Sequence, residues 1–96
     1  MIVKEKIPSR ETCAEAGWFA WDFILEKPLE DAAIFSLRPL GSFVYLSMLS
    51  RPFFKIEMPY ALIKGLRGDS HIRVAVHNEH REILADVERF LSRLPG

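Results

Sequence analysis

The chain has 96 residues, of which 49% are apolar, 11% aromatic and 27% charged. This length fits one domain, residues 1–96, which buries roughly 60–65% of the surface that the unfolded chain exposes. The composition is typical of a globular domain and excludes a disordered or fibrous chain. Thirteen basic residues balance thirteen acidic residues. Because nucleic-acid binders usually carry a basic excess, we expect no nucleic-acid partner.

The charges are unevenly spread along the chain. Residues 11–32 contain one lysine against six acids, a net charge of −5. Residues 33–73 contain six bases against two acids, a net charge of +4. Two segments of opposite charge can steer self-association or attract a charged partner, although solvated loops and helix faces produce the same pattern.

The sequence also bears on the cellular compartment. Cys13 is the single cysteine, so no intramolecular disulfide can form, which favours a reducing, cytoplasmic location. The first residues lack the apolar core of a signal peptide. The longest apolar run, residues 18–25, is interrupted by Asp22 and is far shorter than the roughly 20 residues that span a bilayer. We therefore expect no membrane association.

The first third of the chain has an ambiguous pattern. Residues 2–7 fit a short strand or an arm that Pro8 ends. Thr12 and Glu15 fit a capping box, which predicts a helix over residues 12–26. The aromatic residues in the second half of this segment also alternate with the period of a strand, so that alternative stays open.

The middle of the chain predicts a β-meander. Residues 32–38, 42–49 and 53–58 alternate or are rich in strand formers, and turn-forming residues separate them. Three consecutive strands with short connections form an antiparallel sheet. The central strand is apolar on both sides, so we expect both of its faces to be covered.

A turn and a loop follow. Pro59 is well placed to begin a short helical turn over residues 60–66. Gly65 and Gly68 then lie among basic residues, but their spacing matches no phosphate-binding loop. This segment predicts a tight turn into the next strand.

The last third is the clearest part of the sequence. Residues 70–77 predict a strand, and Asn78 is a good N-cap for the helix that follows. Six apolar residues then repeat at helical spacing, so this helix should pack across the sheet: Ile83, Leu84, Val87, Phe90, Leu91 and Leu94. The predicted fold is α+β, an antiparallel β-meander with an N-terminal helix and a C-terminal amphipathic helix on the sheet. A rival interpretation makes residues 81–85 a last strand and residues 86–94 a short helix, an architecture like the pleckstrin-homology barrel.

One cluster of groups at the last strand–helix junction predicts an anion site. Arg73 and His77 point to the same side of the strand, and His80 lies in the first turn of the helix. Asn78 adds the free amides and dipole of a helix N-terminus, which favour a phosphate or carboxylate. His77 and His80 are too few for a metal, since a stable site needs three or four ligands. We therefore expect no metal.

The aromatic run predicts an interaction patch. Trp18, Phe19, Trp21 and Phe23 follow one another so closely that a core this small has difficulty covering all four. Large apolar patches on small proteins usually mark a partner surface. Core packing is the alternative.

No catalytic residues are expected, because Cys13 has no base near it in sequence and no acid–base pair is evident. No cofactor is expected either. The leading hypothesis is a non-enzymatic interaction or self-association module, a homodimer that uses residues 18–25 or an open sheet edge. The alternative is a small regulatory domain that binds an anionic metabolite at Arg73, His77, Asn78 and His80.

Overall fold

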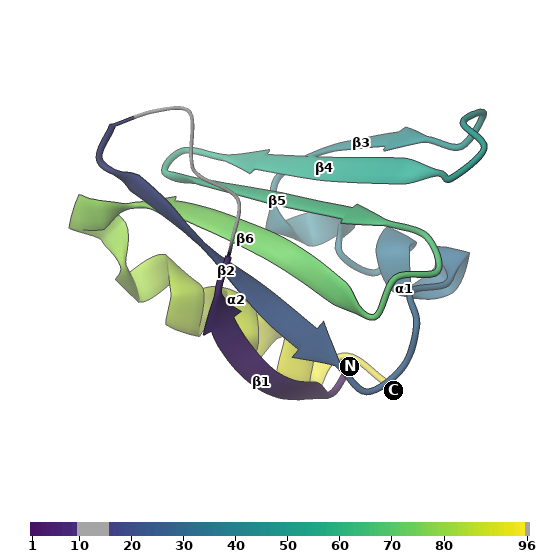
Figure 1. Ribbon diagram of the computed structural model, residues 1–96, viewed down its shortest axis with the longest axis horizontal. Coiled ribbons are helices and arrows are strands. Elements are labelled where there is room, and N and C mark those ends of the chain that lie inside the picture. The colour runs from purple at the N-terminus through teal and green to yellow at the C-terminus, as the bar shows by residue number, and fades with distance from the viewer. Residues whose placement is uncertain (10–15, 96) are drawn as a thin grey trace.

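The computed structural model describes residues 1–9 and 16–95. These residues form a six-stranded antiparallel sheet with the strand order β1-β2-β6-β5-β4-β3 (Figure 1). The strands are β1 (Val3–Pro8), β2 (Trp18–Leu25), β3 (Ser42–Leu46), β4 (Phe53–Met58), β5 (Ala61–Leu66) and β6 (His71–His77). The strands β1 and β3 are therefore the two edges of the sheet.

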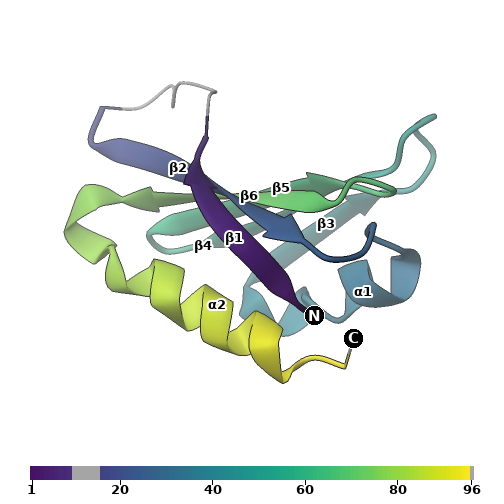
Figure 2. The same ribbon diagram turned by 60° about the horizontal axis from the view of Figure 1, so that its bottom comes forward.

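In the described part of the chain, all helices lie on one face of the sheet and none covers the other, which we call the open face (Figure 2). They are α1 (Asp31–Phe35), the 3₁₀ helices η1 (Arg38–Leu40) and η2 (Asn78–His80), and α2 (Glu82–Arg93). The long helix α2 contacts β1 and β6, whereas η1 contacts β3 and β4. The two edges of the sheet are thus supported by different helical segments.

The core lies between the sheet and the helices. Alternate residues of the strands point into it, because side chains in a strand alternate between the two faces of a sheet. Phe23 on β2, Phe54 on β4 and Val74 on β6 are fully buried there, together with Val87 and Leu91 of α2. The rest of the predicted apolar stripe of α2 is partly buried against the same core.

The predicted N-terminal helix is wrong. Residues 18–25 form β2, and the first helix of the described chain, α1, follows that strand. The capping-box residues Thr12 and Glu15, and Cys13 between them, lie outside the described residues. The strand prevails because β2 pairs with β1 on one side and with β6 on the other, and its alternating residues fill the core face.

The predicted meander is also wrong in part. Its first member, residues 32–38, is replaced by the helix α1, whose first turn carries Asp31. A carboxylate is favourable there because helix N-termini are electropositive. Among the described residues β3 has a strand, β4, on one side only, so it lies at the edge of the sheet and is not the covered central strand that its apolar sequence predicted.

The helical turn predicted over residues 60–66 is a strand, β5. Met58 pairs with Ala61, so Pro59 and Tyr60 form a two-residue hairpin loop. The first residues of β5 alternate between buried positions, including Ile63, and half-buried positions. This period of two suits the second strand of a hairpin better than a single turn of helix.

The last third of the chain agrees with the prediction, apart from the cap. The structure confirms the strand, as β6, and the C-terminal helix, as α2; the rival strand over residues 81–85 is wrong. Asn78 is not the N-cap of α2, because the helix begins at Glu82 and Arg81 is its N-cap. The amide of Asn78 instead donates to the carbonyl of Gly17 at 2.8 Å and extends the β2–β6 pairing. His77 caps η2 instead, its Nδ1 accepting from the amide of Glu79 at 3.2 Å.

Candidate functional site

The edge strand β3 lacks the features that usually protect a sheet edge from strand pairing. Its sequence, Ser-Phe-Val-Tyr-Leu, has neither a charged residue nor a proline. Within the described ranges it pairs with β4 alone, so every second amide and carbonyl faces outward. Exposed edges of this kind are ready templates for another strand, and most proteins blunt them with charges, prolines or bulges.

Both faces of β3 are apolar near this edge. On the open face, Val44 and Leu46 are each 37% exposed. On the helix face, the ring of Phe35 contacts Phe43 and Tyr45 at centroid distances of 6.0 and 5.3 Å. Phe35 itself is 40% exposed. A strand that paired with β3 would therefore bury apolar side chains above and below the sheet.

The hairpin loop after β3 extends this apolar surface. Met48 is 83% exposed and Leu49 is 46% exposed. Contiguous exposed apolar residues on a small protein typically mark a contact surface. We call β3, Phe35, Met48 and Leu49 the β3 surface.

A polar contact fixes the β3 surface to the helical layer. The Tyr45 hydroxyl donates to Oδ1 of Asp31 at 2.6 Å, and Nε of Arg67 lies 3.5 Å from the same oxygen. The hydrogen bond to Asp31, together with desolvation and the carboxylate charge, raises the pKa of Tyr45 above its ordinary value of 10.0. The edge strand is thus held in place without covering its outward backbone groups.

The structure separates the residues of the predicted anion site. His77, Asn78 and His80 lie together at the end of β6. Arg73 is four residues earlier on the strand, so its Cα is about 13 Å from that of His77. Its Nε donates to Oγ of Ser9 at 3.4 Å. Arg73 thus contacts Ser9 in this structure, and the anion site at the junction stays a prediction.

The two histidines belong to an aromatic cluster. The rings of Tyr60 and His80 stack with centroids 3.8 Å apart and an interplanar angle of 10°. Trp18 meets His77 edge-on at 6.0 Å. His80 Nδ1 also lies 3.3 Å from a Glu82 oxygen. This carboxylate at the junction offsets the positive charge that an anion would need.

The four residues of the predicted aromatic patch are divided between the core face and the open face of the sheet. Phe23 is completely buried. Phe19 and Trp21 pack against the same core and are partly buried. Trp18 lies on the opposite, open face, where it pairs with His77 of β6. The four residues therefore do not form one continuous surface.

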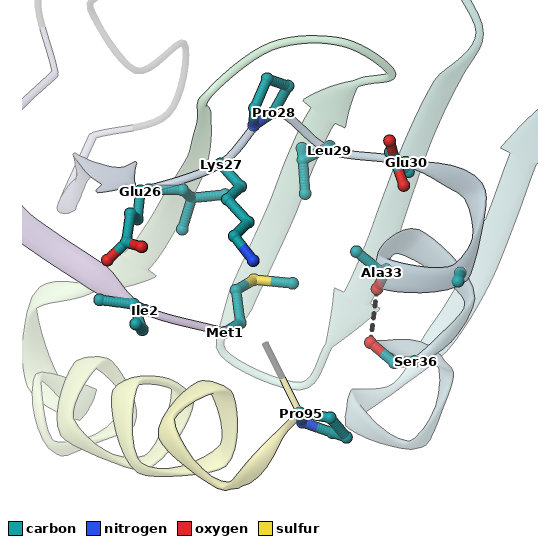
Figure 3. A pocket seen from close by; sticks show the side chains of 12 residues that line it. Met1, Ile2, Glu26, Lys27, Pro28, Leu29, Glu30, Ala33, Ser36 and Pro95 are labelled. Carbon is teal, nitrogen blue, oxygen red and sulfur yellow. Dashed lines mark hydrogen bonds between the residues drawn. The ribbon is translucent and has the colours of Figure 1, made fainter.

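A hollow of about 590 Å³ lies between α1 and the segment after α2 (Figure 3). Its walls are mostly apolar, including Met1, Leu29 and Pro95, and the Lys27 side chain extends across it toward Met1. The Ser36 hydroxyl at its side donates to the carbonyl of Ala33 at 2.5 Å. Among the described residues that line this hollow, no acid forms an ion pair with a base.

Two further classes of site are absent from residues 1–9 and 16–95. No group of three or more histidine, cysteine, aspartate or glutamate residues in these ranges is placed to hold a metal ion. None of the helices there has the length and apolar character needed to cross a bilayer.

Comparison with protein-family models, with curated proteins and with solved structures gives no match to this chain. The choice of the β3 surface as the candidate site therefore rests on its geometry alone. The sequence prediction named an open sheet edge as a possible interface but did not identify which strand supplies it. The available signal was the uncharged run over residues 42–46, which the predicted meander placed in the centre of the sheet.

Proposed function

We propose that this domain is a non-enzymatic self-association module and that β3 pairs with β3 of a second copy. The observation that carries the proposal is the edge strand Ser42–Leu46, which is uncharged, apolar on both faces and paired on one side only among the described residues. Pairing across this edge satisfies outward backbone groups and removes apolar side chains from water.

An antiparallel arrangement around a two-fold axis fits this strand. Centred on Val44, it places Val44 beside its own copy, Phe43 beside Tyr45 of the partner, and Ser42 beside Leu46 of the partner. Aromatic and β-branched pairs across strands stabilise a sheet. Because an axis of this kind uses the same patch on both copies, the assembly closes as a dimer.

A second copy is a better occupant than an unrelated peptide. The β3 surface of one copy matches the other in length, and each copy covers the apolar residues that its partner exposes on both faces of the sheet. No charged side chain of either β3 meets another in this pairing. The single cysteine supports the further proposal that the dimer works in the reducing cytoplasm.

The test is sedimentation equilibrium of the wild type and of Val44→Lys. In the proposed dimer this substitution brings two lysines together at the axis, beside Lys55 of each copy. We expect the dissociation constant of the dimer to rise at least about 100-fold, which corresponds to about 2.7 kcal/mol. Circular dichroism should show an intact fold.

Ile7→Lys is the matched control. Ile7 is 39% exposed, close to the 37% of Val44, but it lies on the opposite edge strand, β1. We expect its dimer to be as stable as the wild type. A monomeric wild-type protein at high micromolar concentration, or an equal loss of association in both variants, would refute the proposal. Stable binding of a β-strand peptide to a monomeric wild type would point to a foreign partner instead.

A further inference from the structure

The open face of the sheet carries a row of charged residues. The strand registers align one residue from each strand across the whole sheet: Ile7, Asp22, Arg73, Lys64, Lys55 and Val44. The three cations at the centre of this row, on β6, β5 and β4, are direct neighbours. Their Cβ atoms are spaced at about 4.5–5.5 Å per strand pair.

Adjacent like charges of this kind destabilise a sheet. Lys55 has a partner, since its Nζ lies 3.0 Å from Oε1 of Glu57. Lys64 is half-buried between Arg73 and Lys55, and no carboxylate in the described part of the chain forms an ion pair with it. Lys64 thus has a cation on each neighbouring strand and no ion-pair partner among the described residues.

The row borders a depression of about 570 Å³ on the same face. Ser9, Lys64 and Arg73 form a polar part of its lining, whereas Phe53 and Leu66 form an apolar part. This volume is within the range of about 300–1,000 Å³ that small-molecule sites occupy. The depression therefore combines two cations with an apolar wall at the scale of a small ligand.

We propose that this depression binds a small anion with an apolar body. Its single phosphate or carboxylate group lies between Lys64 and Arg73, where it offsets the repulsion of the cation row. Its body lies against Phe53 and Leu66. The acids Asp22 and Asp69 also line the depression, and they disfavour an extended polyanion such as a nucleic acid.

The variants used below change no residue of the β3 surface, so the site can be tested independently of dimer formation. We would titrate ¹⁵N-labelled protein with phenyl phosphate, benzoate, inorganic phosphate and the neutral benzamide at constant ionic strength. The expected result is a saturable shift of β5 and β6 amides with phenyl phosphate or benzoate, and weaker binding of benzamide and inorganic phosphate. Whichever aromatic anion binds more tightly identifies the head group.

Three variants complete the test. Lys64→Gln should weaken binding of the preferred anion at least fivefold, and Phe53→Thr should weaken it while leaving inorganic phosphate unchanged. Arg93→Gln removes an exposed cation from α2, on the other side of the sheet, and should bind as the wild type does.

Three results would overturn the proposal. One is equal binding by Lys64→Gln and the wild type. Another is equal binding of benzamide and the aromatic anions, which would show that charge is not recognised. The third is tighter binding of a short single-stranded oligonucleotide with shifts that extend to Trp18, which would identify the face as a nucleic-acid surface.

Discussion

The two edge strands of the sheet have opposite designs. In β1, Lys4, Glu5 and Lys6 are charged, Pro8 removes a backbone donor, and the register shifts between Val3 and Glu5. In β3 none of these features is present. Charges, prolines and bulges are the devices that keep an edge from pairing with another chain. One edge is therefore protected and the other is open.

Side-chain exposure alone does not distinguish the two edges. Ile7 and Val44 lie at the two ends of the same cross-strand row and are 39% and 37% exposed. The two strands differ in their backbone, since only β1 has a proline and a register shift, and in charge, since only β1 has charged residues. Side-chain anchoring also differs: Lys6 of β1 forms an ion pair with Glu88 of α2, whereas Tyr45 anchors β3 to Asp31 of α1.

The largest effect on stability should come from overpacking the core next to β4, the strand that pairs with β3. A Cβ added at Gly65 of β5 would lie 2.5 Å from Cε1 of the fully buried Phe54. Phe54 belongs to β4, the strand that carries β3. We expect Gly65→Ala to lower the free energy of unfolding by about 1–3 kcal/mol in urea denaturation. Hydrogen exchange should accelerate more in β3 and β4 than in β1.

Ser50→Ala, in the exposed turn between β3 and β4, is the control and should unfold as the wild type does. Unchanged stability of Gly65→Ala would show that the Phe54 ring moves aside freely and that the two edges are equally supported.

A smaller effect should follow from removing the protection of β1. In the Val44→Lys background, we would replace Lys4 and Pro8 with valine, which restores a backbone donor and removes a charge from this edge. We expect weak association to return, with the dissociation constant lowered about tenfold, or about 1.4 kcal/mol. Sedimentation velocity measures this change. A variant that stays as monomeric as its background would show that these two residues do not protect the edge.

The smallest effect should come from the Tyr45 anchor. Since the pKa of Tyr45 is raised in the folded state, the unfolded tyrosine loses its proton first. The stability that this group contributes is complete below pH 10 and is lost as the pH rises through the folded-state pKa. Tyr45→Phe should therefore be slightly less stable at pH 7 and should show a smaller decline above pH 10 in urea denaturation.

Tyr60→Phe removes a hydroxyl from an exposed ring and should leave the stability at pH 7 unchanged. If Tyr45→Phe shows the same decline above pH 10 as the wild type, the hydrogen bond to Asp31 does not anchor the edge strand.

The sequence by itself determined the elements whose periodicity is long or regular. The stripe from Ile83 to Leu94 identified α2, and the alternation over residues 53–58 and 70–77 identified β4 and β6. These patterns are informative because each element has one apolar face, and burying that face against any partner gives the same local structure.

Only the tertiary structure decided where each strand lies in the sheet. The same apolar run over residues 42–46 fits a covered central strand or an open edge, and its place depends on α1 replacing a strand beside it. Likewise, the row that joins Arg73, Lys64 and Lys55 comes from the pairing of three strands. Pairing register is a property of contacts between distant segments, so the open edge and the cation row exist only once the sheet has assembled.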